Sequence, residues 1–227
     1  MRGRREIHSE PRVSSLPVSD SSPGRQATDP YWVDKFNDGG YQIVMAMCFK
    51  DNVGSANYNV AASTGMVGPL MVASWVDDYQ ITGSTQTFRA GTQVILPDGD
   101  CDTIAISGLE SIASQQVYVL PRWSTHHVED DKSVQKGSFA LRNGVTASAV
   151  VTMLMEGKYL PIYISPFEFP PGQTVFTPVP RVVFWFQPAL AQSTMITKGQ
   201  ETTCEVDMSA TASATISFDR EGKWNRK

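Results

Sequence analysis

The sequence predicts an all-β fold, an antiparallel β-sandwich with one or two short helices. Short apolar runs recur at roughly even spacing between Tyr41 and Phe218, and Gly, Pro, Asn and Asp residues separate them. Runs of this length and spacing, divided by turn residues, are typical of sandwiches and barrels. Segments with helical periodicity are scarce, so strands must supply most of the core.

The clearest strand signal lies between residues 147 and 164, where two apolar runs flank a turn at Glu156-Gly157-Lys158. Alternate residues of each run are apolar, and a period of two places them on one face of a strand. A glycine between two such runs indicates a hairpin. The residues expected to share the buried face are Ala147, Ala149, Val151, Met153 and Met155 in the first run, and Leu160, Ile162 and Ile164 in the second.

Thirteen segments are expected to be strands. Asn143-Gly144 is the best two-residue turn, and it is expected to join the strands on either side of it as a hairpin. The expected strands are residues 41–49, 57–62, 70–82, 92–97, 102–107, 116–123, 137–142, 146–155, 159–165, 181–188, 193–196, 202–208 and 211–218.

Two segments carry helix-start signals. Asp29 followed by Pro30 supplies an N-cap and a first-turn proline, which predicts one or two helical turns over residues 31–36, ended by Gly39. Such a helix is expected to cover one end of the core. Ser107 and Glu110 have the spacing of a capping box, which predicts a short helix or turn near residues 108–115.

The chain divides into a flexible basic arm, residues 1–28, and one sandwich domain, residues 29–227. The arm is rich in Ser, Pro and Arg and has no apolar periodicity, so it buries too little surface to offset its ordering entropy. Its positive charge suits either a tether to an anionic partner or a solvated tail. The arginines that make it basic are Arg2, Arg4, Arg5, Arg12 and Arg25.

Composition narrows the possible partners and compartment. The net charge of -4 argues against nucleic acid as a partner, except through the arm. Cys48, Cys101 and Cys204 lie far apart without a CxxC spacing, which indicates reduced thiols rather than disulfides or a zinc site. No apolar run follows the charged first residues, so we expect a cytoplasmic protein or one exported without a classical leader.

Catalytic and metal-binding signatures are absent from the sequence. It contains neither a GxSxG elbow nor a phosphate-binding glycine loop, so we expect a protein that is not an enzyme and needs no cofactor. His126 and His127 precede Glu129, Asp130 and Asp131. Adjacent strand residues point to opposite faces, so these histidines are not expected to share a metal ion. A solvated acidic loop is the alternative.

Residues 153–169 resemble the central hairpin of the sea-anemone actinoporins and related cytolysins, and residues 88–97 are similar to the strand before that hairpin. The resemblance implies a compact β-sandwich that binds lipid headgroups, typically the phosphocholine of sphingomyelin, beside an aromatic loop. Pore formation is not expected, because residues 1–28 lack the family's amphipathic helix. The positions that carry over are Ser165, Pro166, Phe167, Glu168 and Phe169.

The loop after this hairpin combines three phenylalanines, Phe167, Phe169 and Phe176, with several prolines between Pro166 and Pro180. A stiff apolar loop could contact a membrane, a neighbouring subunit or a ligand at low entropic cost. Alternatively, the rings tuck back into the core, as phenylalanine usually does. Trp75, Tyr79 and Trp123 are the further candidate ligand contacts.

We therefore predict a non-enzymatic binding protein that recognises a membrane lipid headgroup. Two alternatives remain open, because sandwiches host many functions. The first is a jelly-roll-like assembly or capsid-type subunit that forms homo-oligomers. The second is a glycan-binding lectin.

Overall fold

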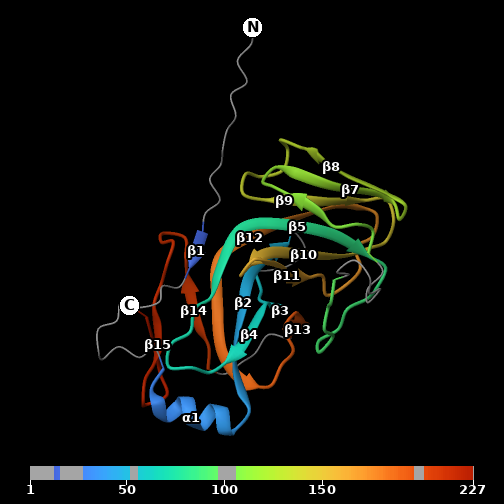
Figure 1. Cartoon of the computed structure of the whole chain (residues 1–227). Coiled ribbons are helices and arrows are strands. Elements are labelled where there is room, and N and C mark those ends of the chain that lie inside the picture. Colours follow the sequence, from blue (N-terminus) through green and yellow to red (C-terminus); the bar gives the residue numbers. More distant parts are fainter. Residues whose placement is uncertain (1–12, 16–27, 52–55, 97–105, 197–201, 227) are drawn as a thin grey trace.

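The computed structural model describes residues 13–15, 28–51, 56–96, 106–196 and 202–226. These residues form sixteen strands and one helix, and most of the strands belong to two sheets that pack face to face (Figure 1). The predicted all-β sandwich is confirmed. Most of the predicted basic arm lies outside the described residues, but Val13–Ser15 form a strand, β1.

The smaller main sheet has the strand order β1-β5-β10-β11, with β6 also paired to β5. Its strands are β1, β5 (Ser74–Ser84), β6 (Glu110–Ile112), β10 (Ser148–Met155) and β11 (Lys158–Ile164). The larger sheet has the order β4-β2-β12-β9-β7-β8, with β14 also paired to β12. Its strands are β2 (Tyr41–Asp51), β4 (Ser63–Met66), β7 (Gln116–Arg122), β8 (Thr125–Asp130), β9 (Phe139–Asn143), β12 (Gly172–Pro188) and β14 (Cys204–Asp207). Two short pairs complete the fold, β3 (Val60–Ala61) with β13 (Thr194–Met195) and β15 (Ile216–Phe218) with β16 (Trp224–Arg226).

Pairings between strands far apart in the chain are nested. The first long strand, β2, pairs antiparallel with the long late strand β12, and between them in sequence β5 pairs antiparallel with β10. Figure 1 shows β12 running from the end that carries β7, β8 and β9 to the end beside α1. The pair that is outer in sequence, β2 and β12, therefore lies in the larger sheet, and the pair that it encloses in sequence, β5 and β10, lies in the smaller one.

The hairpin predicted around Glu156-Gly157 is confirmed. β10 and β11 pair from Met155 and Lys158 outward, and Glu156 and Gly157 have φ values of 50° and 81°. Positive φ at both central residues is the two-residue hairpin turn that matches strand twist. The apolar alternation was correct for the first run, because the odd-numbered residues from Ala147 to Met155 all lie in the core. In the second run Ile162 lies in this core and Leu160 packs against it, but Ile164 belongs to a separate cluster with Val150.

The core fills the space between the two sheets. The small and flexible side chains of β10 face Met45, Met47 and Phe49 of β2. An aromatic cluster continues from there, because the Phe49 and Tyr163 rings lie 5.3 Å apart and the Tyr163 and Phe176 rings 5.4 Å apart. Aromatic pairs at such distances add to the stabilisation from buried area.

The helix predicted after Asp29 is confirmed as α1 (Pro30–Asp38), with Gly39 at its C-cap. The Asp29 carboxylate accepts a hydrogen bond from the Tyr31 backbone N–H at 2.9 Å, which satisfies one of the free donors of the first turn. The helix covers one end of the sandwich, where the Phe36 ring stacks on Phe186 at 4.3 Å.

Two local predictions were wrong. Instead of a helix, residues 110–112 form β6, because the free edge of β5 pairs with them. Asn143-Gly144 does not close a hairpin, because β9 belongs to the larger sheet and β10 to the smaller one. The Asn143 side-chain amide instead donates to the carbonyl oxygens of Val145, Phe169 and Pro170. These bonds fasten the crossing, the segment in which the chain passes from β9 to β10, to the loop before β12.

Two further segments differ from expectation. The predicted acidic loop after Thr125 is strand β8 at the edge of the larger sheet. The proline-rich segment expected to be loop forms the first half of β12. The register shifts between Val179 and Val182, which leaves Pro180 outside the regular ladder, and a proline cannot donate a hydrogen bond to that ladder.

Candidate functional site

The loop singled out by the sequence is fastened at one end to β10 and at the other to Ala147, the residue before β10. The Ser165 N–H donates to the Ala149 carbonyl oxygen at 2.9 Å, and the Ser165 hydroxyl accepts from the Ala149 N–H at 2.8 Å. At the other end, the N–H groups of Phe169 and Ala147 donate to each other's carbonyl oxygens, at 2.8 and 3.1 Å. Pro166, Phe167 and Glu168 are therefore the exposed residues of a short, tied loop.

The three phenylalanines of this region have different environments. Phe169 and Phe176 are buried and belong to the core, whereas Phe167 is 41% exposed. The exposed Glu168 carboxylate accepts a hydrogen bond from the Thr87 hydroxyl at 2.8 Å. The sequence left open whether these rings are buried in the core or exposed for binding. Phe169 and Phe176 are buried, and Phe167 is exposed.

The remaining ring candidates are not next to this loop. Trp75 and Tyr79 of β5 both line a cavity of about 430 Å³ between the two sheets, and neither Phe167 nor Trp123 lines it. Trp123 is half-buried in the turn between β7 and β8. The predicted site residues therefore occupy three separate places: the tied loop, the cavity and the β7–β8 turn.

The cavity, hereafter the β5 cavity, has an apolar floor and a polar rim. Its floor contains Met47, Trp75, Val182 and Met208, all buried. Its wall includes residues 178–180 of β12 and residues 209–212 after β14, and Asp77 is exposed at its rim. The Tyr79 hydroxyl donates to the Asp77 carboxylate at 3.3 Å. Burial, followed by the charge of Asp77, raises the pKa of Tyr79, so this hydroxyl stays protonated and donates.

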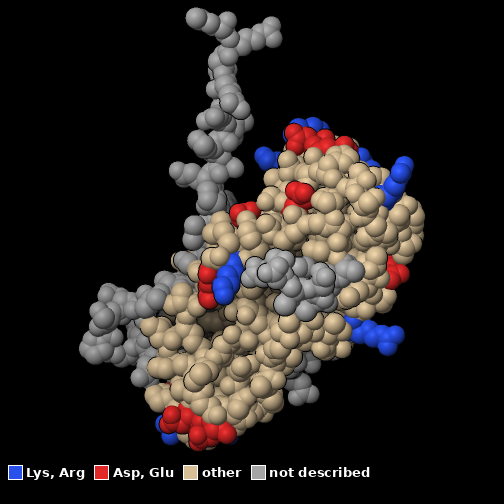
Figure 2. All heavy atoms as spheres, turned by 45° about the vertical axis from the view of Figure 1, so that its right-hand side comes forward, with Lys and Arg blue, Asp and Glu red and all other residues tan. Residues whose placement is uncertain are grey.

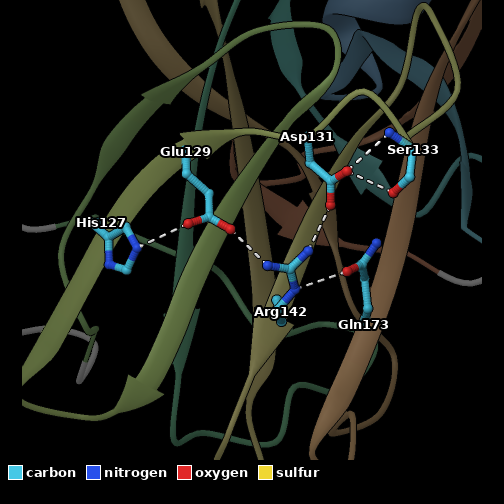
Figure 3. A network of polar contacts seen from close by, with 6 residues as sticks. All are labelled: His127, Glu129, Asp131, Ser133, Arg142 and Gln173. Carbon is cyan, nitrogen blue, oxygen red and sulfur yellow. Dashed lines mark hydrogen bonds and ion pairs between the residues drawn. The ribbon is translucent and has the colours of Figure 1, made fainter.

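A polar network lies on the outer face of the larger sheet (Figure 3). The Arg142 guanidinium of β9 reaches two carboxylates, with its Nη1 2.7 Å from Glu129 Oε1 and its Nη2 2.6 Å from Asp131 Oδ2. Its Nε donates to Gln173 Oε1 at 3.0 Å. Ser133 donates to the Asp131 carboxylate through both its N–H and its hydroxyl, at 2.9 and 2.6 Å.

These contacts hold the network together as a clamp. The hydrogen bonds from Ser133, and then those from Arg142, lower the pKa of Asp131, because they favour the charged carboxylate. Each of the three guanidinium nitrogens of Arg142 donates a hydrogen bond to a side-chain oxygen of the protein. The arrangement ties the edge strand β8 and the turn after it to β9 and β12.

The two histidines of β8 diverge, as their strand positions predicted. The His126 Nε2 lies 3.2 Å from Glu110 of β6, and its ring stacks on Tyr118 at 5.7 Å. His127 instead lies 3.4 Å from Glu129. Among the residues with described positions, no three His, Cys, Asp or Glu side chains are close enough together to hold a metal ion.

An exposed apolar area that the sequence analysis missed lies beside the other edge of the larger sheet. Met66 is 77% exposed, Val72 42% and Leu70 40%. Met66 ends the edge strand β4, and Met66 and Val72 both line a second cavity of about 340 Å³. We call Met66, Leu70 and Val72 the β4 patch. A run of apolar residues around Gly68-Pro69 was the available signal, but periodicity does not show which members are exposed.

Charge is unevenly distributed on the surface. On the face shown in Figure 2, charged side chains lie at both ends, at the right-hand side and in one acidic and basic pair beside a hollow, and other residues cover the area between them. The apolar parts of such an area are candidates for contacts with other molecules.

Within the described ranges, no helix has both the length and the apolar character needed to cross a bilayer. Comparisons with protein-family models, curated proteins and solved structures find no significant match to this chain.

Proposed function

We propose that the protein is a non-enzymatic assembly subunit, a jelly-roll-like sandwich whose copies associate through the β4 patch. The observation that carries this proposal is the β4 patch, where Met66 is 77% exposed at the end of an edge strand without charged residues. Met66 also lines a cavity whose other lining residues are uncharged except for Glu156. An exposed sheet edge with apolar side chains is a favourable surface for association.

The contrast between the two edges of the larger sheet supports this proposal. Edge strand β8 carries His127, Glu129 and Asp130, and Arg142 clamps it from β9. Charged edges resist pairing with other chains. By contrast, β4 has the sequence Ser-Thr-Gly-Met and pairs only with β2 among the described strands. The two edges of the larger sheet thus differ as expected if the charged edge at β8 faces water and the edge at β4 faces a partner.

The strand connectivity is also consistent with an assembly role. Nested pairing of β2 with β12 and of β5 with β10 is the pattern of a rolled-up jelly roll, an architecture used by viral capsid proteins and by lectins. The connectivity departs from a regular jelly roll where β7 and β9 pair in parallel. Architecture alone does not select a function, so the β4 patch is the deciding feature.

Lipid recognition through the aromatic loop remains a prediction with a smaller basis. Phe169 and Phe176 are core residues, which leaves Phe167 as the exposed phenylalanine of the loop. A glycan site commonly needs exposed aromatic faces as well, and Trp75 is buried at 3% exposure. Among the residues that the structure describes, neither alternative has an exposed apolar area comparable to the β4 patch.

Sedimentation velocity of the purified full chain tests the proposal. We expect the wild type to form oligomers or particles at tens of micromolar, and Met66→Lys and Val72→Lys to shift the population toward monomers, because each places a charge in an apolar contact. Ile95→Lys is the matched control, since Ile95 is also an exposed apolar residue, at 50%, but lies outside the patch. Circular dichroism checks that each variant is folded.

A wild-type chain that stays monomeric over this range would contradict the proposal. Cosedimentation with sphingomyelin-containing and phosphatidylcholine-only vesicles completes the test. Binding by a monomer that Phe167→Ser abolishes would favour the lipid-binding function instead.

A further inference from the structure

The smaller sheet accepts an extended segment along the edge of β5. β1 pairs antiparallel with β5 through three residues, with Ser15 opposite Ser74, Ser14 opposite Trp75 and Val13 opposite Val76. Farther along the same edge, β5 pairs with β6 at Tyr79–Ile81. Backbone groups of β5 that would otherwise form an open edge are thus paired by a short strand from the N-terminal region.

This strand docks beside the β5 cavity. Trp75, which lies opposite Ser14, also lines the cavity, and Asp77 and Tyr79 follow it along β5. Peptides that add a strand to a sheet gain affinity from backbone hydrogen bonds and specificity from adjacent side-chain pockets. An edge with paired backbone groups and a neighbouring cavity of about 430 Å³ has both parts of such a docking site.

The connection between the strand and the body is long enough to reach another copy. Thr28 is fastened to the body, since its N–H donates to the Pro69 carbonyl oxygen at 3.3 Å. Twelve residues separate Ser15 from Thr28, and a chain of that length spans at most roughly 45 Å. A compact chain of this size has a radius of gyration of about 17 Å, so the reach is comparable to the diameter of one body.

We propose that, in the assembled protein, the β5 edge and its cavity bind Val13–Ser15 of a second copy, so that subunits exchange N-terminal strands. The same three pairs form within one chain or between two, and exchange of an identical element is a low-cost route to association. In an assembly the strand meets the β5 edge of a neighbouring copy at a high effective concentration, as it does that of its own chain. This inference rests on the proposed function, and it adds a second contact to that made by the β4 patch.

Cysteine cross-linking distinguishes exchange from docking within one chain. Ser15 and Ser74 are opposite each other, and serine to cysteine is nearly isosteric. Ser15→Cys and Ser74→Cys are prepared as separate full-length proteins, each with Cys101→Ser; Cys48 and Cys204 are buried and remain. The two proteins are dissociated in mild denaturant, mixed, reassembled and oxidised. A disulfide between them forms only when a strand from one copy docks on another.

We expect the mixture to give a cross-linked dimer on non-reducing gels, several-fold above the amount from either protein alone. The matched control pairs Ser15→Cys with Ser111→Cys, since Ser111 is exposed on β6 at the same edge but is not opposite β1. That mixture is expected to give no increase over its components.

The doubly substituted chain, Ser15→Cys with Ser74→Cys, identifies the alternative. A linked dimer or a ladder of linked chains supports exchange, whereas internally linked monomers, with no dimer from the mixture, overturn it. Absence of any cross-link also overturns it, because β1 would then not dock on β5. Sedimentation of the same samples separates the two proposals: oligomers without exchange leave the assembly function standing, and monomers throughout refute that function as well.

Discussion

The Tyr163 hydroxyl donates a hydrogen bond of 2.6 Å to the Asp51 carboxylate, and both residues are buried. Tyr163 belongs to β11 of the smaller sheet and Asp51 ends β2 of the larger one, so the bond joins the two layers of the sandwich. Burial, and then the hydrogen bond to Asp51, raise the pKa of Tyr163. A buried carboxylate stabilised in this way depends on its donors.

Tyr163→Phe is expected to lower the free energy of unfolding by about 2 kcal/mol, because a hydrogen bond to a buried charged acceptor is lost while the ring stays packed. Tyr159→Phe is the control, since the Tyr159 hydroxyl donates to Asp78 at 2.7 Å in a less buried place. Urea denaturation of the two variants measures the difference. Equal losses would show that burial does not strengthen the Tyr163 bond.

Alkaline pH is expected to destabilise the fold through its tyrosines. Hydrogen bonding to Asp78 raises the pKa of Tyr159 to about 12, and burial raises the pKa of Tyr58, Tyr79, Tyr118 and Tyr163. Folding thus favours the protonated phenols, so the stability they contribute is complete below about pH 10 and is lost as pH rises above it. Near-ultraviolet absorbance should show that phenolate forms at a higher pH in the native protein than in the unfolded chain. A titration that matches the unfolded chain would contradict this.

The two neighbouring phenylalanines of the tied loop should respond differently to truncation. Phe169→Ala leaves a cavity in the core and is expected to cost about 3–5 kcal/mol, because Phe169 is 2% exposed. Phe167→Ala is expected to change stability by less than about 1 kcal/mol, since its ring is 41% exposed. Chemical denaturation measures both, and a large loss for Phe167→Ala would show that this ring is also a core residue.

Gly144 is required by a close approach of two backbone segments. A Cβ at this position would lie 2.6 Å from the Pro121 carbonyl oxygen, so Gly144→Ala must displace either β7 or the crossing to β10. We expect a loss of about 1–3 kcal/mol, as for other overpacked sites. Gly65→Ala is the control, because a Cβ there meets no atom within 4 Å. Thermal unfolding measures the Tm of both variants. Equal Tm values would refute the close approach.

Loss of the Arg142 clamp should loosen the edge strand β8. Arg142→Met keeps much of the side-chain length but removes the contacts to Glu129, Asp131 and Gln173. We expect amide hydrogen exchange to accelerate several-fold in β8 and to change little in β10, because local opening reflects local contacts. Unchanged exchange in β8 would show that its pairing with β7 suffices.

The same network should respond to acid. The pKa of Asp131 is lowered, chiefly by Ser133 and then by Arg142, so the stability it contributes is present above about pH 4 and is lost as pH falls below it. In wild type, the protection factors of the β8 amides, which compare each exchange rate with the intrinsic rate at the same pH, are therefore expected to fall in acid. This fall should be smaller in Arg142→Met, and an unchanged fall would assign the effect to Ser133.

The elements predicted correctly are those whose signals are local. The β10–β11 hairpin follows from alternating residues around Glu156-Gly157, and α1 follows from Asp29 and Pro30, because turn geometry and capping involve residues close in sequence. The separation of His126 from His127 also follows from strand geometry alone. The all-β class follows from many such signals taken together.

The errors occurred where a distant strand competes with a local signal. Asn143-Gly144 has hairpin chemistry, but the strands on its two sides belong to different sheets. The Ser107–Glu110 spacing is that of a helix start, but the free edge of β5 takes Glu110–Ile112 as a strand. Pairing partners far away in sequence override local preference when they satisfy more backbone hydrogen bonds.

By itself, the sequence determined the fold class, the main hairpin and the helix that covers one end, because these depend on periodicity, turns and caps. Only the tertiary structure decided that Phe169 and Phe176 are core residues, that Phe167 is exposed, and that Met66 lies at an open sheet edge. Exposure depends on which sheets cover a side chain. That information lies in contacts between residues far apart in the chain, and the residues' own chemistry does not contain it.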